Sequence, residues 1–268
     1  MKHITSKDGT PIACWHSGHG EALLLVHGTA SDHGAWNPLI PFLESHFTVW
    51  TLDRRGRGHS GDNSDYSLHH EAEDIVAVIQ AIGGKVHLLG HSFGGLCALE
   101  AALLTKNIAS LMLYEPPLSL AGSGWSAKLD QEMQTLLNTG HNEAALLLFF
   151  RDVLNTSKQE LIELQASQNW STRIAIAPSV HRELQAVDNY SFNAGINCVD
   201  LAVQRLYSTP TLLLLGSDSP KRRHRIAETL HNILPNSQLV LLNGQQHSAV
   251  RTAPLLLASK VIKFVHKQ

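Results

Sequence analysis

The sequence has few of the features that mark secreted, disulfide-bonded or metal-binding proteins. Its three cysteines, Cys14, Cys97 and Cys198, are far apart in 268 residues and form no CxxC pair. An odd and scattered set of this kind is typical of a reducing compartment. Histidine is frequent, with 17 residues, but no HExxH or similar spacing is present. We therefore expect no metal site.

Long hydrophobic runs and a strong net charge are also missing. The apolar segments are too short to span a bilayer, and the first residues, MKHIT, lack the apolar run of a signal peptide. The net charge is −2 and the pI is near 6.8, so no global field attracts nucleic acid or an acidic membrane. We predict a cytoplasmic protein that binds neither. The basic run at residues 221–225, KRRHR, is interpreted as a solvated helix face.

Hydrophobic residues make up 43% of the chain and charged residues 16%, which is ordinary for a folded protein. Short apolar runs alternate with longer amphipathic segments, a pattern typical of βαβ units and a parallel sheet. Ser67 is expected to cap a helix that runs to about Ile82, and another helix should run from just after Ser92 to about Lys106. The expected strands are 12–15, 22–26, 48–52, 85–89, 110–114, 211–215 and 238–242.

The alternation fails between about Pro116 and Thr209, where only helical segments are expected. A helical insertion of roughly ninety residues is far too long for a βα connection. We predict a core of residues 1–115 and 210–268, with residues 116–209 as a helical lid over the carboxyl ends of the strands. A small domain unrelated to catalysis is the alternative. The lid helices are expected at about 128–137, 143–154, 159–168, 178–187 and 199–207. Candidates for lining the pocket, which could equally form the lid core, are Trp125, Phe149, Phe150, Trp170, Tyr190 and Phe192.

The segment Gly90-His91-Ser92-Phe93-Gly94 lies between a predicted strand and a predicted helix. This is the setting of a nucleophile elbow, a turn so tight that larger residues at Gly90 and Gly94 would collide. The serine then projects from the sheet near the positive end of the helix dipole. The pattern predicts Ser92 as a nucleophile.

Two further segments complete a site around Ser92. The predicted strand 22–26 runs into His27-Gly28-Thr29, and the backbone N–H groups of Thr29 and Phe93 are predicted to form an oxyanion hole. His27 is expected to order this loop. His247 follows the last predicted strand and fits the chain order nucleophile, acid, histidine, so we predict it as the general base.

With these motifs the sequence resembles the α/β-hydrolase superfamily over nearly the whole chain, and within it the monomeric bacterial serine hydrolases with a helical cap. Residues 53–60 (DRRGRGHS), 113–117 (LYEPP) and 216–220 (GSDSP) add to the resemblance. The implied fold is α/β, with a mostly parallel central sheet flanked by helices and a helical lid inserted before the penultimate strand. The arginines of residues 53–60 look like a phosphate site but are expected to be structural.

The sequence departs from the family pattern at the acid of the catalytic triad. Most members carry G-x-x-D after the penultimate strand, but here that position is Ser219 and the carboxylate is one residue earlier, at Asp218. Glu115 stands at the end of the preceding strand, a position that resembles the acid of certain haloalkane dehalogenases. Pro116 and Pro117 would stiffen the backbone behind it. Glu115 is favoured, and Asp218 stays the alternative.

These residues predict a serine hydrolase that cleaves an ester-type bond of a small, largely apolar acyl or aryl substrate through an acyl-enzyme intermediate. Neither a metal nor an organic cofactor is needed, and a monomer or small homo-oligomer is expected. A carbon–carbon bond hydrolase or lyase, or a cofactorless perhydrolase, on the same Ser–His site is an alternative. A non-catalytic small-ligand receptor on a hydrolase scaffold is an alternative of another class, which the presence of both Ser92 and His247 disfavours.

Overall fold

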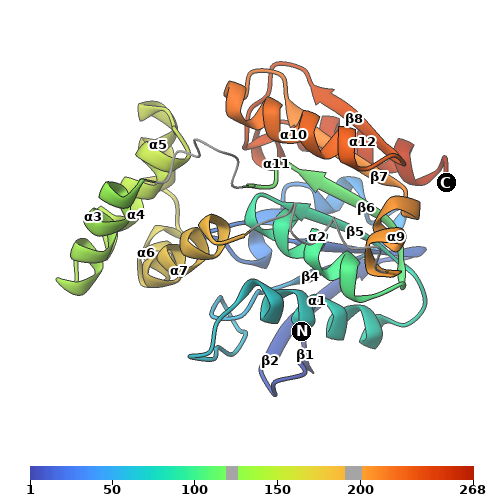
Figure 1. The fold of residues 1–268 in the computed structure, drawn as a ribbon, viewed down its shortest axis with the longest axis horizontal. Coiled ribbons are helices and arrows are strands. Elements are labelled where there is room, and N and C mark those ends of the chain that lie inside the picture. The colour runs from blue at the N-terminus through green and yellow to red at the C-terminus, as the bar shows by residue number, and fades with distance from the viewer. Residues whose placement is uncertain (119–125, 191–200) are drawn as a thin grey trace. The chain divides into compact units, whose positions relative to one another are not determined.

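The computed structural model describes residues 1–118, 126–190 and 201–268 (Figure 1). The chain divides into two compact units, one formed by Met1–Leu118 with Ser191–Gln268 and the other by Ser119–Tyr190. The lid role of the second unit stays a prediction. Three residues considered above lie outside the described residues: Trp125, Phe192 and Cys198.

The first unit is built on an eight-stranded sheet with the strand order β1-β2-β4-β3-β5-β6-β7-β8. The pairs β1–β2 and β2–β4 are antiparallel, and every later pair, from β3–β4 to β7–β8, is parallel. The strands are β1 (Lys2–Thr5), β2 (Pro11–Gly18), β3 (Glu21–Val26), β4 (Phe47–Leu52), β5 (Val86–His91), β6 (Ile108–Tyr114), β7 (Thr211–Gly216) and β8 (Ser237–Leu242).

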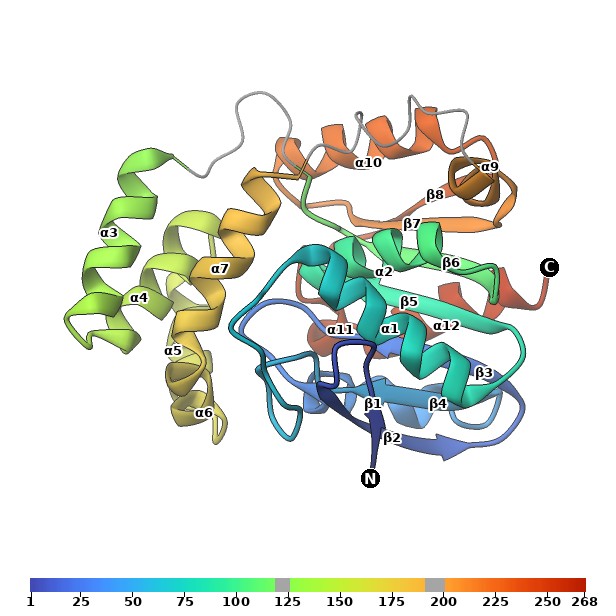
Figure 2. The same ribbon diagram turned by 60° about the horizontal axis from the view of Figure 1, so that its bottom comes forward.

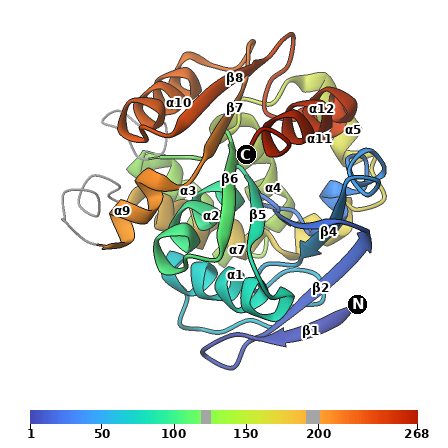
Figure 3. The same cartoon turned by 90° about the vertical axis from the view of Figure 1, so that its right-hand side faces the viewer.

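Helices cover both faces of this sheet, as its nearly continuous buried strands require. The view in Figure 3 has α1, α2 and α10 on one face and α12 on the other. The helices are α1 (Leu68–Ile82), α2 (Phe93–Leu104), α9 (Leu201–Ser208), α10 (Lys221–Ile233), α11 (Ala249–Thr252) and α12 (Pro254–Val265), with 3₁₀ segments η1 (His33–Trp36) and η2 (Ile40–Phe42).

Local sequence explains how these helices begin and what they bury. The Ser67 hydroxyl accepts a hydrogen bond from the His70 N–H at 3.2 Å and caps α1, as predicted. On the opposite face of the sheet, α12 places Leu257, Val261 and Phe264 in the apolar core. Each such buried side chain stabilises the fold by about 1.5–3 kcal/mol.

The second unit is helical in its described part, residues 126–190 (Figure 2). Its aromatic residues Phe149, Phe150 and Trp170 are buried. The ring centroids of Phe149 and Phe150 are 5.4 Å apart, and those of Phe150 and Trp170 are 6.2 Å apart. The elements are α3 (Ala127–Asn138), α4 (Asn142–Leu148), a π-helical turn (Phe149–Val153), α5 (Lys158–Gln165), α6 (Trp170–Ala175) and α7 (Ala177–Asp188).

Two features of the chain differ from the expected elements. The strand β1 was not predicted because KHIT is short and buries almost nothing of its own. The helix expected at 143–154 changes from α-helix to π-helix at Phe149, a backbone change that side-chain periodicity does not encode.

Within the described ranges, no helix is long and apolar enough to cross a membrane.

Candidate active site

The candidate site lies where four neighbouring strands end at one edge of the sheet. Register pairs His91 of β5 with Tyr114 of β6, Tyr114 with Leu214 of β7, and Gly216 of β7 with Leu242 of β8. The segments that leave these strands carry Ser92, Glu115, Ser219 and His247. Carboxyl ends of parallel strands are the usual place for a ligand site in an α/β sheet.

Ser92 occupies a strained turn between β5 and α2. Its backbone has φ 54° and ψ −128°, and positive φ in a residue other than glycine costs on the order of 1–3 kcal/mol. A Cβ at Gly90 would lie 2.4 Å from the Gly94 carbonyl oxygen, and a Cβ at Gly94 would lie 2.3 Å from that of His27. Both glycines are therefore required, because each replacement would collide with backbone rather than with another side chain.

The loop after β3 lies against Ser92. A Cβ at Gly28 would be 3.0 Å from the Ser92 Cβ. The Gly28 carbonyl accepts hydrogen bonds from His27 Nδ1 at 2.9 Å and from Arg54 Nη2 at 3.3 Å. Because the carbonyl and the next N–H of a trans peptide point in opposite directions, these two donors fix the direction of the Thr29 N–H.

His27 holds this loop as a neutral imidazole. Complete burial, reinforced by the Arg54 cation, keeps the His27 pKa well below its usual range. Its Nε2 accepts the Arg54 backbone N–H at 3.1 Å, so the proton is on Nδ1, which donates to Gly28. The other predicted oxyanion donor, the Phe93 N–H, opens α2 at a position where helix amides have no partner within the helix. The oxyanion hole itself stays a prediction.

Glu115 is a buried carboxylate with four donors. Oε1 accepts the Gly216 N–H at 2.9 Å and the Ser219 hydroxyl at 2.5 Å. Oε2 lies 2.7 Å from His247 Nδ1 and 3.2 Å from Arg223 Nη1. Burial acts to raise the Glu115 pKa, but His247, Arg223 and Ser219 outweigh it and lower the pKa to about 2. The carboxylate is therefore ionised through the neutral range.

Asp218, the alternative acid, is in a different environment. Its side chain is exposed, and Oδ1 accepts a hydrogen bond from the Ser217 hydroxyl at 2.7 Å. The contacts thus join Glu115, rather than Asp218, to His247. Ser219, which replaces the usual aspartate of the family, donates its hydroxyl to Glu115.

The loop that carries His247 is attached to the ends of β5 and β6. His91 Nε2 donates to the His247 carbonyl at 2.9 Å, and the two rings are 4.6 Å apart. The Tyr114 hydroxyl donates to the Gln246 carbonyl and accepts the Ala249 N–H at 3.1 Å. Sequence reasoning did not find these roles of His91 and Tyr114, because neither residue lies near this loop in the chain.

Arg223 corrects the interpretation of the basic run 221–225. That run was expected to be a solvated helix face, but the Arg223 side chain is only 10% exposed. Its Nη1 lies 2.7 Å from His247 Nδ1 and 3.2 Å from Glu115 Oε2. Burial lowers the Arg223 pKa, while Glu115 acts to raise it. The sequence did hold a signal, since three basic residues open α10 where the helix dipole disfavours them.

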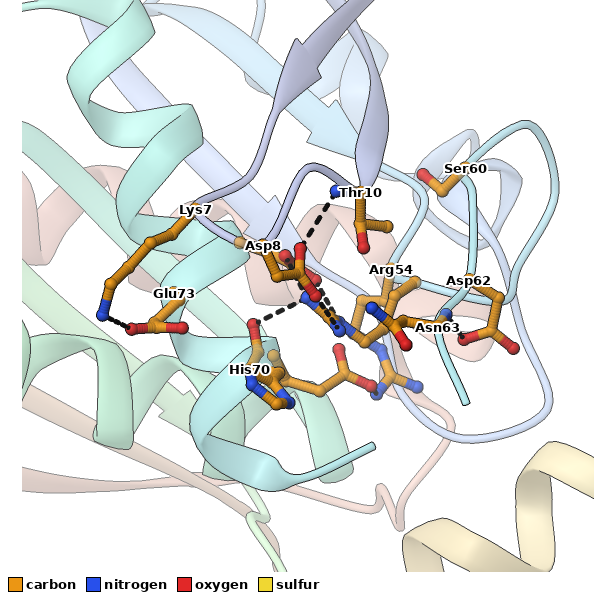
Figure 4. A network of polar contacts seen from close by, with 12 residues as sticks. Lys7, Asp8, Thr10, Arg54, Ser60, Asp62, Asn63, His70 and Glu73 are labelled. Atoms are coloured by element: carbon orange, nitrogen blue, oxygen red, sulfur yellow. Dashed lines mark hydrogen bonds and ion pairs between the residues drawn. The ribbon is translucent and has the colours of Figure 1, made fainter. Parts of the chain in front are cut away.

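Arg54 and Arg55 are paired with carboxylates, and Arg57 donates to the Arg55 carbonyl at 3.0 Å. Arg54 Nη1 lies 3.1 Å from Glu71 Oε1, and Arg55 contacts Asp74 at 2.7 Å and Asp8 at 2.9 Å. Figure 4 shows Asp8 also accepting the Thr10 N–H at 3.0 Å. These contacts tie the β1–β2 hairpin to α1, in keeping with a structural role. Across residues 1–118, 126–190 and 201–268, no group of three or more His, Cys, Asp or Glu side chains is arranged to hold a metal ion.

Comparison with known proteins places this geometry in context. A model of the alpha/beta hydrolase family matches residues 23–259. A crystal structure of an alpha/beta hydrolase from Sphaerobacter thermophilus DSM 20745 is 32% identical with a TM-score of 0.84, covering 98% of this chain and 99% of that one. The predicted fold, a mostly parallel sheet flanked by helices, is thereby confirmed.

Two curated relatives match a shorter stretch at higher identity. A pimeloyl-[acyl-carrier protein] methyl ester esterase from Methylococcus capsulatus is 37% identical over 111 residues, which are 41% of this chain and 42% of the relative. An N-formylmaleamate deformylase from Pseudomonas putida is 39% identical over 111 residues, which are 40% of this chain and 41% of the relative. The first name describes the cleavage of a methyl ester, and the second describes the removal of a formyl group.

Proposed function

The chain belongs to the alpha/beta hydrolase family, and from that premise we propose that it is a serine hydrolase of ester-type bonds. The substrate is a small, largely apolar acyl or aryl ester, and the reaction passes through an acyl-enzyme intermediate. The observation that carries this proposal is the 2.7 Å contact between Glu115 Oε2 and His247 Nδ1. This contact lies at the sheet edge where Ser92 stands in its strained turn.

Each residue has a defined role in the proposed reaction. His247 takes the proton of the Ser92 hydroxyl, and Oγ attacks the acyl carbon of the substrate. The N–H groups of Thr29 and Phe93 stabilise the oxyanion of the tetrahedral intermediate. His247 then protonates the leaving alcohol and activates the water that hydrolyses the acyl-enzyme. Glu115 keeps the Nδ1–H tautomer of His247 and stabilises its protonated form.

The two shorter matches favour acyl transfer but name different bonds. The relative from Methylococcus capsulatus is named for a methyl ester, and the one from Pseudomonas putida for a formyl amide. A formyl amide is therefore the second candidate substrate class. The same nucleophile, base and oxyanion donors act on both bonds, so a substrate panel has to include both.

The test is covalent labelling with a fluorophosphonate probe, followed by peptide mapping of the adduct. Wild-type protein should be labelled on Ser92, and Ser92→Ala should lose labelling with an unchanged circular dichroism spectrum. Ser259→Ala, which removes an exposed hydroxyl on α12, is the matched control and should be labelled like wild type. An adduct on another residue, or full labelling of Ser92→Ala, would overturn the assignment.

A panel of short and medium acyl esters with matched formyl amides then identifies the bond. Ester turnover that depends on Ser92 supports the proposal, and faster turnover of the formyl amides moves it to the second substrate class. Tight binding of a small ligand without turnover of any substrate would instead favour a receptor.

A further inference from the structure

Arg223 is a buried cation in an unfavourable part of its helix. It stands in the first turn of α10, which has no acidic residue to offset Lys221, Arg222 and Arg223. Positive charge at a helix N-terminus opposes the helix dipole, and a buried arginine is rarely found without a partner. The close polar groups around Arg223 are Glu115 and His247. The position of Arg223 is therefore explained by the candidate active site and not by α10.

Arg223 changes the charge balance of the pair formed by Glu115 and His247. An arginine is always protonated in proteins, so Glu115 has a cation at 3.2 Å whatever the state of His247. A buried carboxylate without that cation would favour a protonated histidine beside it. With Arg223 present, the carboxylate is compensated while His247 is neutral, and a second positive charge at 2.7 Å disfavours protonation of His247.

We propose that Arg223 is a positioning residue that serves as the permanent counter-ion of Glu115 and keeps His247 neutral at pH values where a Glu–His pair alone would hold a proton. This inference rests on the proposed function, because a general base must be unprotonated to accept the proton of Ser92. Arg223 thus extends the working range of the base toward lower pH.

The other titratable groups around the cluster do not supply this charge. Burial keeps the pKa of His91 well below its usual range, and burial together with Glu115 raises the pKa of Tyr114. Both residues are therefore uncharged near neutral pH. Arg222 adds a second, half-buried positive charge from α10 itself. Glu115 carries the negative charge of the cluster, and His247 is the member that changes state.

The geometry also allows Arg223 to be replaced without releasing Glu115. Oε1 of the carboxylate is held independently by the Gly216 N–H and the Ser219 hydroxyl. Arg223→Gln removes the charge and keeps an N–H donor, whereas Arg223→Lys keeps the charge and changes the donor geometry. Arg225→Gln removes an exposed arginine from the same helix and is the matched control.

The experiment is an NMR titration of protein with labelled histidine, in which the His247 signal is assigned by its absence from His247→Ala. We expect the pH midpoint of His247 protonation to rise by about one unit or more in Arg223→Gln and to stay near the wild-type midpoint in Arg223→Lys and Arg225→Gln. An unchanged or lower midpoint in Arg223→Gln overturns the proposal. An equal rise in Arg223→Lys also overturns it, because the charge is then not the cause.

A measurement on wild-type protein keeps the proposal falsifiable if Arg223→Gln does not fold. The ¹⁵N shifts of His247 at neutral pH should show a neutral ring, and protonation of both nitrogens there overturns the proposal. The titration needs no substrate, so its outcome is independent of the fluorophosphonate test. If wild type is not labelled but the midpoint moves as expected, the proposed function fails and the counter-ion role of Arg223 stands. If the probe labels Ser92, the labelling rate should fall at low pH, and the pH at which it falls should shift by the same amount as the His247 midpoint.

Discussion

Glu115→Gln replaces a charged carboxylate with a neutral amide, and the amide cannot accept hydrogen bonds from all of the groups that contact Glu115. All four groups around Glu115 face it as donors: the Gly216 N–H, the Ser219 hydroxyl, His247 Nδ1 and Arg223 Nη1. A glutamine amide has one oxygen and one NH₂ group. If the NH₂ group takes the place of Oε1, two donors face each other, because the Gly216 N–H points at the same position. If it replaces Oε2, it meets Arg223 and forces His247 to accept at Nδ1, the tautomer that cannot accept a proton at Nε2.

The size of the effect follows from these contacts. Loss of the orienting carboxylate should lower kcat by about 10⁴-fold, or about 5 kcal/mol of transition-state stabilisation. Arg223 would also remain buried beside an uncharged partner, and breaking a buried ion pair costs about 3–5 kcal/mol of unfolding free energy. Asp218→Asn changes an exposed side chain, so we expect a change within about 0.5 kcal/mol in stability and little change in rate.

The assay compares the rate of fluorophosphonate labelling, the turnover of an ester and the free energy of unfolding in urea for wild type and both variants. Glu115→Gln should lose labelling rate and stability together, while Asp218→Asn should match wild type in both. If the ester turnover of Glu115→Gln stayed within about tenfold of the wild-type rate and Asp218→Asn lost turnover instead, the acid would be Asp218. The reasoning from the four donors would then be wrong.

Two further predictions follow from the charges and the loop geometry. The Glu115 pKa is lowered to about 2 in the folded state. The stability contributed by the ionised carboxylate is therefore fully present above the unfolded-state pKa of about 4.3 and is lost as the pH falls toward 2. Thermal unfolding should show this loss in wild type and a smaller loss in Glu115→Gln. Arg54→Met removes one of the two donors to the Gly28 carbonyl and also the cation beside Glu71. We expect kcat to fall by roughly 10–100-fold while KM stays nearly unchanged. A change in KM alone would contradict the role of Arg54 in positioning the loop.

The parallel strands could be predicted from sequence because most of them contain a short, continuous apolar run. The run LLLV at 23–26 and the run TLLLL at 211–215 are buried almost completely, and burial on both faces leaves no other pattern for such a strand. The strand β1 had no such signal, because its pairing with β2 comes from backbone hydrogen bonds rather than from buried side chains.

The site was predictable as far as it follows chain order. Ser92 and His247 were predicted from the strand and turn around them, and Glu115 from its position after a strand. Their catalytic roles stay predictions, although the structure has the contact between Glu115 and His247. Arg223 could not be predicted in the same way, because a basic run looks the same in sequence whether one of its side chains turns outward or reaches a carboxylate 108 positions earlier.

The donors around Glu115 also determine when during biosynthesis the site is able to form. Glu115 precedes Gly216 by 101 residues, Ser219 by 104 and His247 by 132. At ribosomal rates of about 5–20 residues per second, roughly 7–26 s separate the synthesis of Glu115 from that of His247. During that interval the nascent chain has the elbow sequence but lacks His247 and the donors that contact Glu115. A ribosome-bound chain that ends before β7 therefore carries Ser92 and Glu115 without the base that the proposed reaction requires.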